Sequence, residues 1–141
     1  MKNNIVKEKS FDFAIRIVKL VKLLREDKKE FLITKQLVRS ATSIGACIRE
    51  SEYAESDNDF IHKLHIALKE TNETEYWSDL LYATQHLTEK EHKSIINDCK
   101  EILKLLISIV KTKKENIDNA IDSINSILRK QHPKACIYSY T

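Results

Sequence analysis

Three charged residues are the clearest candidates for a polar site. Glu70 and Glu73 are three positions apart, so on a helix they share one face, and Arg39 lies on the predicted helix before it. A guanidinium can donate several coplanar hydrogen bonds to two carboxylates, which would suit an anion-sensing or catalytic site. The same residues would suit a partly buried ion-pair network that fixes the register of two helices. We favour this structural role, because register is the best-attested use of such networks.

Histidines beside carboxylates raise a second chemistry, that of a di-metal carboxylate bundle. Such a site needs four carboxylates and two Glu-x-x-His units on facing helices. Glu89 and His92 have this spacing. Asp59 and His62 have it too, but both pairs lie at the starts of predicted helices, where we expect exposure. His65 is likewise predicted to lie on the surface. We therefore predict no metal and no cofactor, and keep a di-metal enzyme as a remote alternative.

Other chemistry finds no support in the residues. No glycine-rich phosphate loop is present, and no Ser-His-Asp or Cys-His pair stands in a motif. The cysteines, Cys47, Cys99 and Cys136, are odd in number and far apart, which predicts reduced side chains and no disulfide or zinc framework. The sequence thus predicts a protein without catalytic activity.

The composition favours an all-α fold. A length of 141 residues suits one domain, and a single Gly and a single Pro leave little to form the turns of a strand-rich fold. No apolar run approaches the roughly 20 residues that span a bilayer, and no signal peptide opens the sequence. We expect a cytoplasmic protein with no membrane partner.

Apolar residues at helical spacing predict four long helices. Ser10 is predicted to cap the first helix; the second runs from about residue 31 to 54, and the third from about residue 57 to 86. A capping box at residues 88–91 opens the fourth. The expected inward stripes are Phe13, Ala14, Ile17, Val18, Val21 and Leu24; Ile33, Leu37, Ala41, Ile44 and Ile48; Phe60, Leu64, Ala67, Leu68, Trp77, Leu80, Leu81 and Leu87; and Ile95, Cys99, Ile102, Leu106 and Ile109.

Long helices joined by short polar turns predict an antiparallel up-down-up-down four-helix bundle over residues 1–114. Residues 115–141 are expected to form a C-terminal extension, with a short fifth helix that ends before Pro133 and a tail over residues 135–141. The apolar residues of that short helix are Ile117, Ile121, Ile124 and Leu128.

A few residues within the predicted helices do not follow the inward stripes. Gly45 costs about 1 kcal/mol relative to Ala inside a helix, so we expect a packing notch there. The single Trp77 is expected to fill space against the core. Ile15 and Leu23 fall outside the stripe of the first helix, and we expect them to face a neighbour.

Charge is distributed unevenly along the chain. Residues 1–40 carry a net charge of +6, residues 41–99 of −7 and residues 100–141 of +4, which together give the net +3. The first and fourth helices are neighbours in the predicted bundle, so their lysines and arginines would share one side and attract a polyanion such as RNA or DNA. The candidate nucleic-acid-binding residues are Arg16, Lys19, Lys22, Arg25, Lys28, Lys29, Lys100, Lys104, Lys111, Lys113 and Lys114.

The sequence resembles the 23S rRNA intervening-sequence protein family of bacteria, also called four-helix-bundle proteins. The similarity covers roughly residues 11–113 and is densest over residues 39–81. It rests on Ala-Thr-Ser-Ile-Gly-Ala at residues 41–46, Asp-Phe-Ile at 59–61, Ile-Ala-Leu-Lys-Glu at 66–70 and Glu-Thr-x-Tyr-Trp at 73–77, all in order and spacing. The chain departs from the family at residues 47–51 and at residues 57–58, where Asp-Asn replaces basic residues.

The resemblance implies an all-α bundle that assembles as a ring-shaped homopentamer and has no enzymatic activity. The family includes the accessory variability determinant of diversity-generating retroelements, which binds nucleic acid and a reverse transcriptase. Two functions therefore remain open. One is a nucleic-acid-associated accessory protein, whose charge is multiplied by assembly. The alternative is a protein–protein scaffold that docks an enzyme such as a reverse transcriptase.

Overall fold

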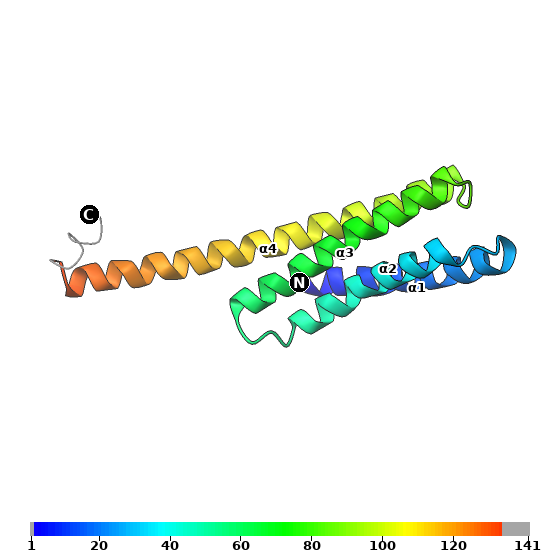
Figure 1. Ribbon diagram of the computed structural model, residues 1–141. Coiled ribbons are helices and arrows are strands. Elements are labelled where there is room, and N and C mark those ends of the chain that lie inside the picture. The colour runs from blue at the N-terminus through cyan, green and yellow to red at the C-terminus, as the bar shows by residue number, and fades with distance from the viewer. Residues whose placement is uncertain (1, 134–141) are drawn as a thin grey trace. The chain divides into compact units, whose positions relative to one another are not determined.

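Four helices and short connections make up the part of the chain that the computed structural model describes, residues 2–133 (Figure 1). The helices are α1 (Lys2–Asp27), α2 (Leu32–Ser51), α3 (Asp57–Ala83) and α4 (Glu89–Gln131). No strand occurs among these residues. The prediction of an all-α four-helix bundle with a C-terminal helical extension is confirmed.

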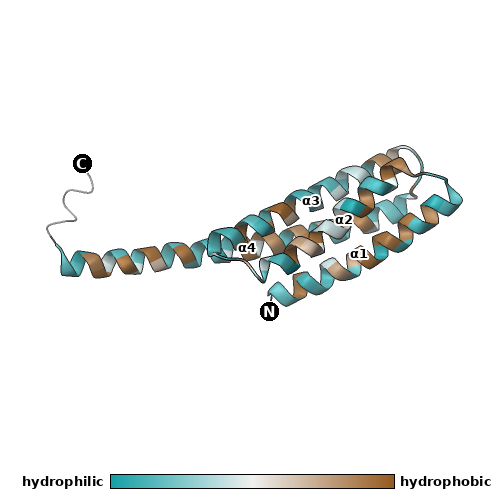
Figure 2. Ribbon diagram, turned by 60° about the horizontal axis from the view of Figure 1, so that its bottom comes forward, coloured by the Kyte–Doolittle hydropathy of each residue, from teal (hydrophilic) through white to brown (hydrophobic). Residues whose placement is uncertain are grey.

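The chain divides into two units, Met1–Val110 and Lys111–Thr141. The first holds α1, α2, α3 and the beginning of α4, which pack side by side around one core (Figure 2). The second holds the rest of α4. The buried apolar residues are Val6, Phe13, Ile17, Val21, Leu24, Leu37, Ala41, Ile44, Ile48, Leu64, Ala67, Leu81, Leu87, Ile95, Cys99, Ile102, Leu106, Ile109 and Val110. Most of the predicted stripes are therefore core residues.

Side-chain caps begin three of the helices. The Asp59 N–H donates to Ser56 Oγ at 3.0 Å, and this contact opens α3 at Asp57, where the third helix was predicted to begin. Thr88 and Glu91 exchange side-chain to backbone hydrogen bonds at 2.9 and 3.1 Å, so the predicted capping box before α4 is confirmed. At α2 the cap comes from Glu30, a residue for which the sequence predicted no role.

The Glu30 carboxylate spans the first turn of α2. It accepts the N–H groups of Ile33 and Thr34, both at 2.8 Å, and that of Leu32 at 3.1 Å. Burial would raise the pKa of Glu30, but these hydrogen bonds together hold it below its usual value. One side chain thus satisfies three backbone donors that a helix start leaves without partners.

The predicted cap at Ser10 and the predicted fifth helix are wrong. Helix α1 already includes Lys2, so Ser10 lies inside it, 1% exposed, and donates its hydroxyl to the Lys7 carbonyl at 3.0 Å. The apolar residues after position 115 belong to α4, which continues without interruption to Gln131 because no Gly or Pro breaks it. The predicted tail at residues 135–141 lies outside the described part of the chain.

Other predicted boundaries differ by a few residues. Helix α2 ends at Ser51 and α3 at Ala83, each about one turn before the predicted end. Lys29 and Gln85, with φ angles of 55° and 66°, stand in the connections that follow α1 and α3, where helices commonly end in a left-handed residue. Among the described residues, no helix is both long and apolar enough to cross a membrane.

Candidate functional site

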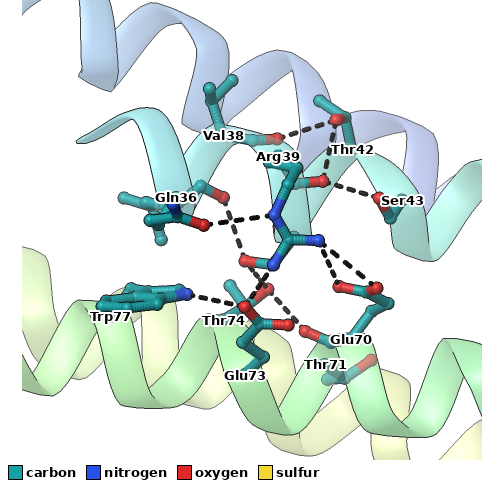
Figure 3. A network of polar contacts seen from close by, with 12 residues as sticks. Gln36, Val38, Arg39, Thr42, Ser43, Glu70, Thr71, Glu73, Thr74 and Trp77 are labelled. Carbon is teal, nitrogen blue, oxygen red and sulfur yellow. Dashed lines mark hydrogen bonds and ion pairs between the residues drawn. The ribbon is translucent and has the colours of Figure 1, made fainter. Parts of the chain in front are cut away.

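Arg39 on α2 lies between Glu70 and Glu73 on α3 (Figure 3). Its Nη1 donates to the two Glu70 carboxylate oxygens at 3.5 and 3.4 Å, and its Nη2 pairs with Glu73 Oε1. Its Nε donates to Gln36 Oε1 at 3.3 Å, and the Trp77 indole N–H donates to Glu73 Oε1 at 3.1 Å. The structure therefore brings the three predicted residues together and adds two neutral partners.

The two carboxylates have different environments although they share one cation. The hydrogen bond from Arg39 holds the pKa of Glu73 below its usual value, and the Trp77 indole acts in the same direction. Burial raises the pKa of Glu70, whose side chain is 18% exposed against 36% for Glu73, and Arg39 offsets this only in part. Glu73 is therefore the main partner of the guanidinium.

This charge balance does not suit anion recognition. One guanidinium faces two carboxylates, so the cluster is negative or neutral and its best donors are already occupied. Beneath it, a buried pair of hydroxyl groups joins α2 to α3, because Thr74 Oγ1 donates to Ser40 Oγ at 2.9 Å. Within α3, the Ser78 hydroxyl donates to the Thr74 carbonyl at 2.8 Å. Small side chains allow the two helices to approach closely. The arrangement can hold α2 against α3 in one register.

Gly45 and Trp77 lie on different seams of the bundle. Gly45 faces α1, where an added Cβ would lie 3.4 Å from Ser10 Oγ and 3.7 Å from the Ser10 backbone. The approach is close, but one methyl group would still fit at ordinary contact distance. Trp77 is partly buried against the core and makes an edge contact with Tyr76, with ring centroids 4.9 Å apart.

The predicted basic side is partly neutralised by acidic residues of α4. Arg16 Nη1 pairs with Asp98 Oδ2 at 2.5 Å, and Lys9 Nζ pairs with Glu101 Oε2 at 2.5 Å, so α1 and α4 are neighbours as expected. The Glu101 hydrogen bond raises the pKa of Lys9, and the same contact lowers that of Glu101. Arg16 is therefore committed to an internal ion pair and is less suited to bind phosphate.

The other candidate cations of the first unit are more open to solvent. Arg25 donates to Thr34 Oγ1 at 3.2 Å and is half-buried. Exposed side chains belong to Lys19, Lys22, Lys28, Lys29, Lys100 and Lys104. The remaining candidates, Lys111, Lys113 and Lys114, belong to the second unit.

Two of the residues considered for a metal, Glu89 and His92, have other partners. His92 lies 2.7 Å from Asp79 Oδ1 and stacks on the Tyr82 ring with centroids 4.5 Å apart, while Glu89 pairs with Lys93. His62 and His65 are exposed. Within residues 2–133, no group of three or more potential ligands gathers.

The cysteines within the described chain are free thiols. Cys47 is half-buried and Cys99 is fully buried in the core. Burial raises the pKa of the Cys99 thiol far above its usual value, which makes this thiol unreactive. Cys136 lies outside the described residues.

A groove between α1 and α2, which we call the α1–α2 groove, was not foreseen. It has a volume of about 560 Å³ and is lined by Lys7, Phe11, Ala14, Thr42, Gly45, Ala46, Arg49, Glu50 and Tyr53. Phe11 is 55% and Tyr53 85% exposed, and the Arg49 guanidinium lies 6.0 Å from the centre of the Phe11 ring. In the sequence, the related signal was that Ile15 and Leu23 fall outside the stripe of the first helix. Both are exposed, but neither lines the groove.

Glu75 on α3 is a second unforeseen feature. Its Oε1 is buried without a hydrogen-bond partner among the described residues. Burial raises the pKa of Glu75, the charge of Asp79 raises it further, and Lys100 partly opposes both. The sequence could not show this, because it depends on which neighbours α4 places beside α3.

Two comparisons place this architecture among known proteins. A family model described as "23S rRNA-intervening sequence protein" matches residues 2–108. A crystal structure from Bacteroides thetaiotaomicron, described as a protein with unknown function from the S23 ribosomal protein family, is 59% identical with a TM-score of 0.78. That match covers 79% of this chain and 99% of the other chain. No curated protein matches the chain.

Proposed function

The chain belongs to the 23S rRNA-intervening sequence protein family, and from this premise we propose that it is a non-catalytic, oligomeric accessory protein that binds nucleic-acid phosphates. The observation that carries the proposal is the set of exposed lysines on α1 and the turn after it. Within the described residues, no carboxylate forms an ion pair with Lys19, Lys22, Lys28 or Lys29. These four side chains are therefore available to phosphate.

The attraction of one subunit is modest. Exposed acidic residues, Glu26 and Asp27, lie in the same segment as these lysines and lower its net charge. Arg16, which the sequence placed in the binding set, is held by Asp98. We therefore propose that binding depends on assembly, because several weakly basic faces on one oligomer act together.

The α1–α2 groove is our candidate for the surface of self-association. Exposed aromatic side chains beside small residues suit a contact with a second copy, since they bury apolar area without a steric barrier. Arg49 and Glu50 bring both charge signs to the same groove, so two copies can meet with complementary charges. A ring of identical subunits, with five as the number that the resemblance implies, forms if the groove of each copy contacts a different surface of the next copy.

The proposal is tested with paired charge reversals. We expect Lys19→Glu with Lys22→Glu to weaken binding of a labelled single-stranded RNA at low salt by more than tenfold. The matched control, Lys69→Glu with Lys90→Glu, changes the net charge equally at exposed positions of α3 and α4 and should have a smaller effect. Equal losses in the two variants would show a non-specific charge effect, and no binding by the unmodified protein would refute the proposal.

A scaffold function is the second candidate, and the α1–α2 groove is the observation that favours it. An enzyme such as a reverse transcriptase would dock there if the groove stayed open in the oligomer. Light scattering of Phe11→Asp separates the two roles, with Glu8→Asp as a control at an exposed position of the same helix. Loss of the oligomer in Phe11→Asp alone assigns the groove to self-association. An unchanged oligomer leaves the groove available for another protein.

A further inference from the structure

The second unit presents an apolar stripe to solvent. Ile121, Ile124 and Leu128 are 49%, 56% and 48% exposed, and Ile127 beside them is 55% exposed. Figure 2 shows apolar bands alternating with polar residues along this part of α4. The family match ends at residue 108, so the stripe is not part of the bundle that family members share.

The spacing of the stripe is that of a coiled-coil seam. Ile117, Ile121, Ile124 and Leu128 follow at intervals of four, three and four residues, which places them at alternating d and a positions of a heptad. A globular protein that covered this helix would require a stripe that is wide along its whole length, whereas here only Ile127 widens the seam. In proteins, most of the stability of a helix comes from packing of its amphipathic face, so this exposed face calls for a partner.

We propose that residues 111–131 form a parallel, in-register coiled coil with the same segment of other copies of this chain. The charges beside the seam favour this partner. Lys113 takes a g position and Asp118 the e position five residues later, so in a parallel pair they face each other across the interface with opposite charge. Along the apolar run the other e and g positions, Ala120, Asn125 and Ile127, carry no charge, and the charged e position Lys111 precedes the run.

The residues at the seam also limit its register and strand number. Lys114 stands at an a position before the apolar run, and a single polar residue there disfavours shifted pairings. Isoleucine at both a and d positions favours three or more strands over two. The seam is short, and the oligomer proposed above would strengthen it by holding several copies of α4 in parallel and at high local concentration.

Disulfide trapping in the full chain tests the proposal. Ile124→Cys and, separately, Ile117→Cys place a thiol on the seam, whereas Ser126→Cys places one on the outer side of the same helix. All three are made with Cys136→Ser, so that this nearby thiol does not contribute. We expect mild oxidation to link identical positions at 124 and 117 at least ten times more efficiently than at 126. Equal yields at all three positions, or none at the seam, would overturn the coiled coil.

A second measurement separates this inference from the proposed function. Ile121→Ser with Ile124→Ser should remove helix signal in circular dichroism, while Ser123→Ala with Ser126→Ala should not. If trapping succeeds and light scattering shows that the Ile121→Ser, Ile124→Ser variant is a monomer, the coiled coil stands and the bundle oligomer is refuted. If the oligomer persists and trapping fails, the coiled coil alone is refuted.

Discussion

Replacing Arg39 by Met would remove the charge of the α2–α3 network while keeping much of its apolar stem. Glu70 and Glu73 would then stand three positions apart on α3 with no cation between them. Because the Arg39 side chain is 46% exposed, solvent screens each ion pair, and exposed pairs contribute at most about 1 kcal/mol. The repulsion left at the more buried Glu70 adds to this. We expect a loss of about 1–1.5 kcal/mol in the free energy of unfolding, or roughly 3–6 °C in Tm.

Thermal unfolding followed by circular dichroism, together with Trp77 fluorescence, measures this loss. The difference between Arg39→Met and the unmodified protein should shrink in about 1 M salt, where the Debye length is near 3 Å. Glu70→Gln in the Arg39→Met background should recover part of the loss, because it removes the half-buried charge that lacks a partner. Asn72→Gln, a neutral change at an exposed position of the same helix, is the matched control and should leave Tm nearly unchanged.

The pH dependence follows from the two carboxylates. The pKa of Glu73 is lowered in the folded state, so its contribution is present above the unfolded pKa and is lost as pH falls through the folded value. The pKa of Glu70 is raised, so protonation of Glu70 relieves a penalty. Both effects make the loss of unfolding free energy in Arg39→Met largest near pH 7 and smallest once the Glu70 and Glu73 carboxylates are protonated. An unchanged Tm at low salt, or a deficit of equal size at pH 3, would refute the electrostatic role.

Three further substitutions test other features of the fold. Glu30→Ala should lower the free energy of unfolding in urea by about 1–2 kcal/mol at pH 7, because α2 loses its cap. The pKa of Glu30 is lowered in the folded state, so this loss should disappear as pH falls through the folded pKa. A loss that persists in acid would contradict the role of the carboxylate. Glu75→Gln should raise the free energy of unfolding by up to about 1 kcal/mol at pH 7, since the raised pKa of Glu75 marks a disfavoured buried charge. This gain should vanish below the pKa of Glu75 in the unfolded chain. A destabilised variant would count against this prediction. Gly45→Ala should raise stability by about 1 kcal/mol, whereas a drop in Tm would show that α1 leaves no room for a Cβ.

The bundle was predictable because its signals are local. Apolar residues at helical spacing marked each inward face, and the Thr88 and Glu91 box marked the start of α4. The wrong predictions concern places where tertiary contacts determine whether a residue lies inside a helix or at its end. Ser10 has the side chain of a cap, but it packs against Gly45 of α2 and lies inside α1. The break expected at position 115 does not occur, because no Gly or Pro interrupts α4 before its end at Gln131.

The candidate sites were predictable only in part. The ion pairs of Arg39 with Glu70 and Glu73 could be predicted, because the two glutamates share a helix face at i, i+3 spacing and Arg39 lies on the neighbouring antiparallel helix. The pairing of Arg16 with Asp98 did not, because it depends on how α4 is rotated against α1. The α1–α2 groove likewise depends on residues that, apart from Ala14, lie off every predicted apolar stripe.

The salt dependence of RNA binding tests the central claim most directly. Fluorescence anisotropy with a labelled single-stranded RNA would give Kd for the full-length chain from about 50 to 300 mM salt. If exposed lysines bind phosphate from several subunits at once, log Kd rises linearly with log salt, and the slope is smaller for Lys19→Glu with Lys22→Glu. No binding at about 50 mM salt, or an affinity that salt leaves unchanged, would contradict the account.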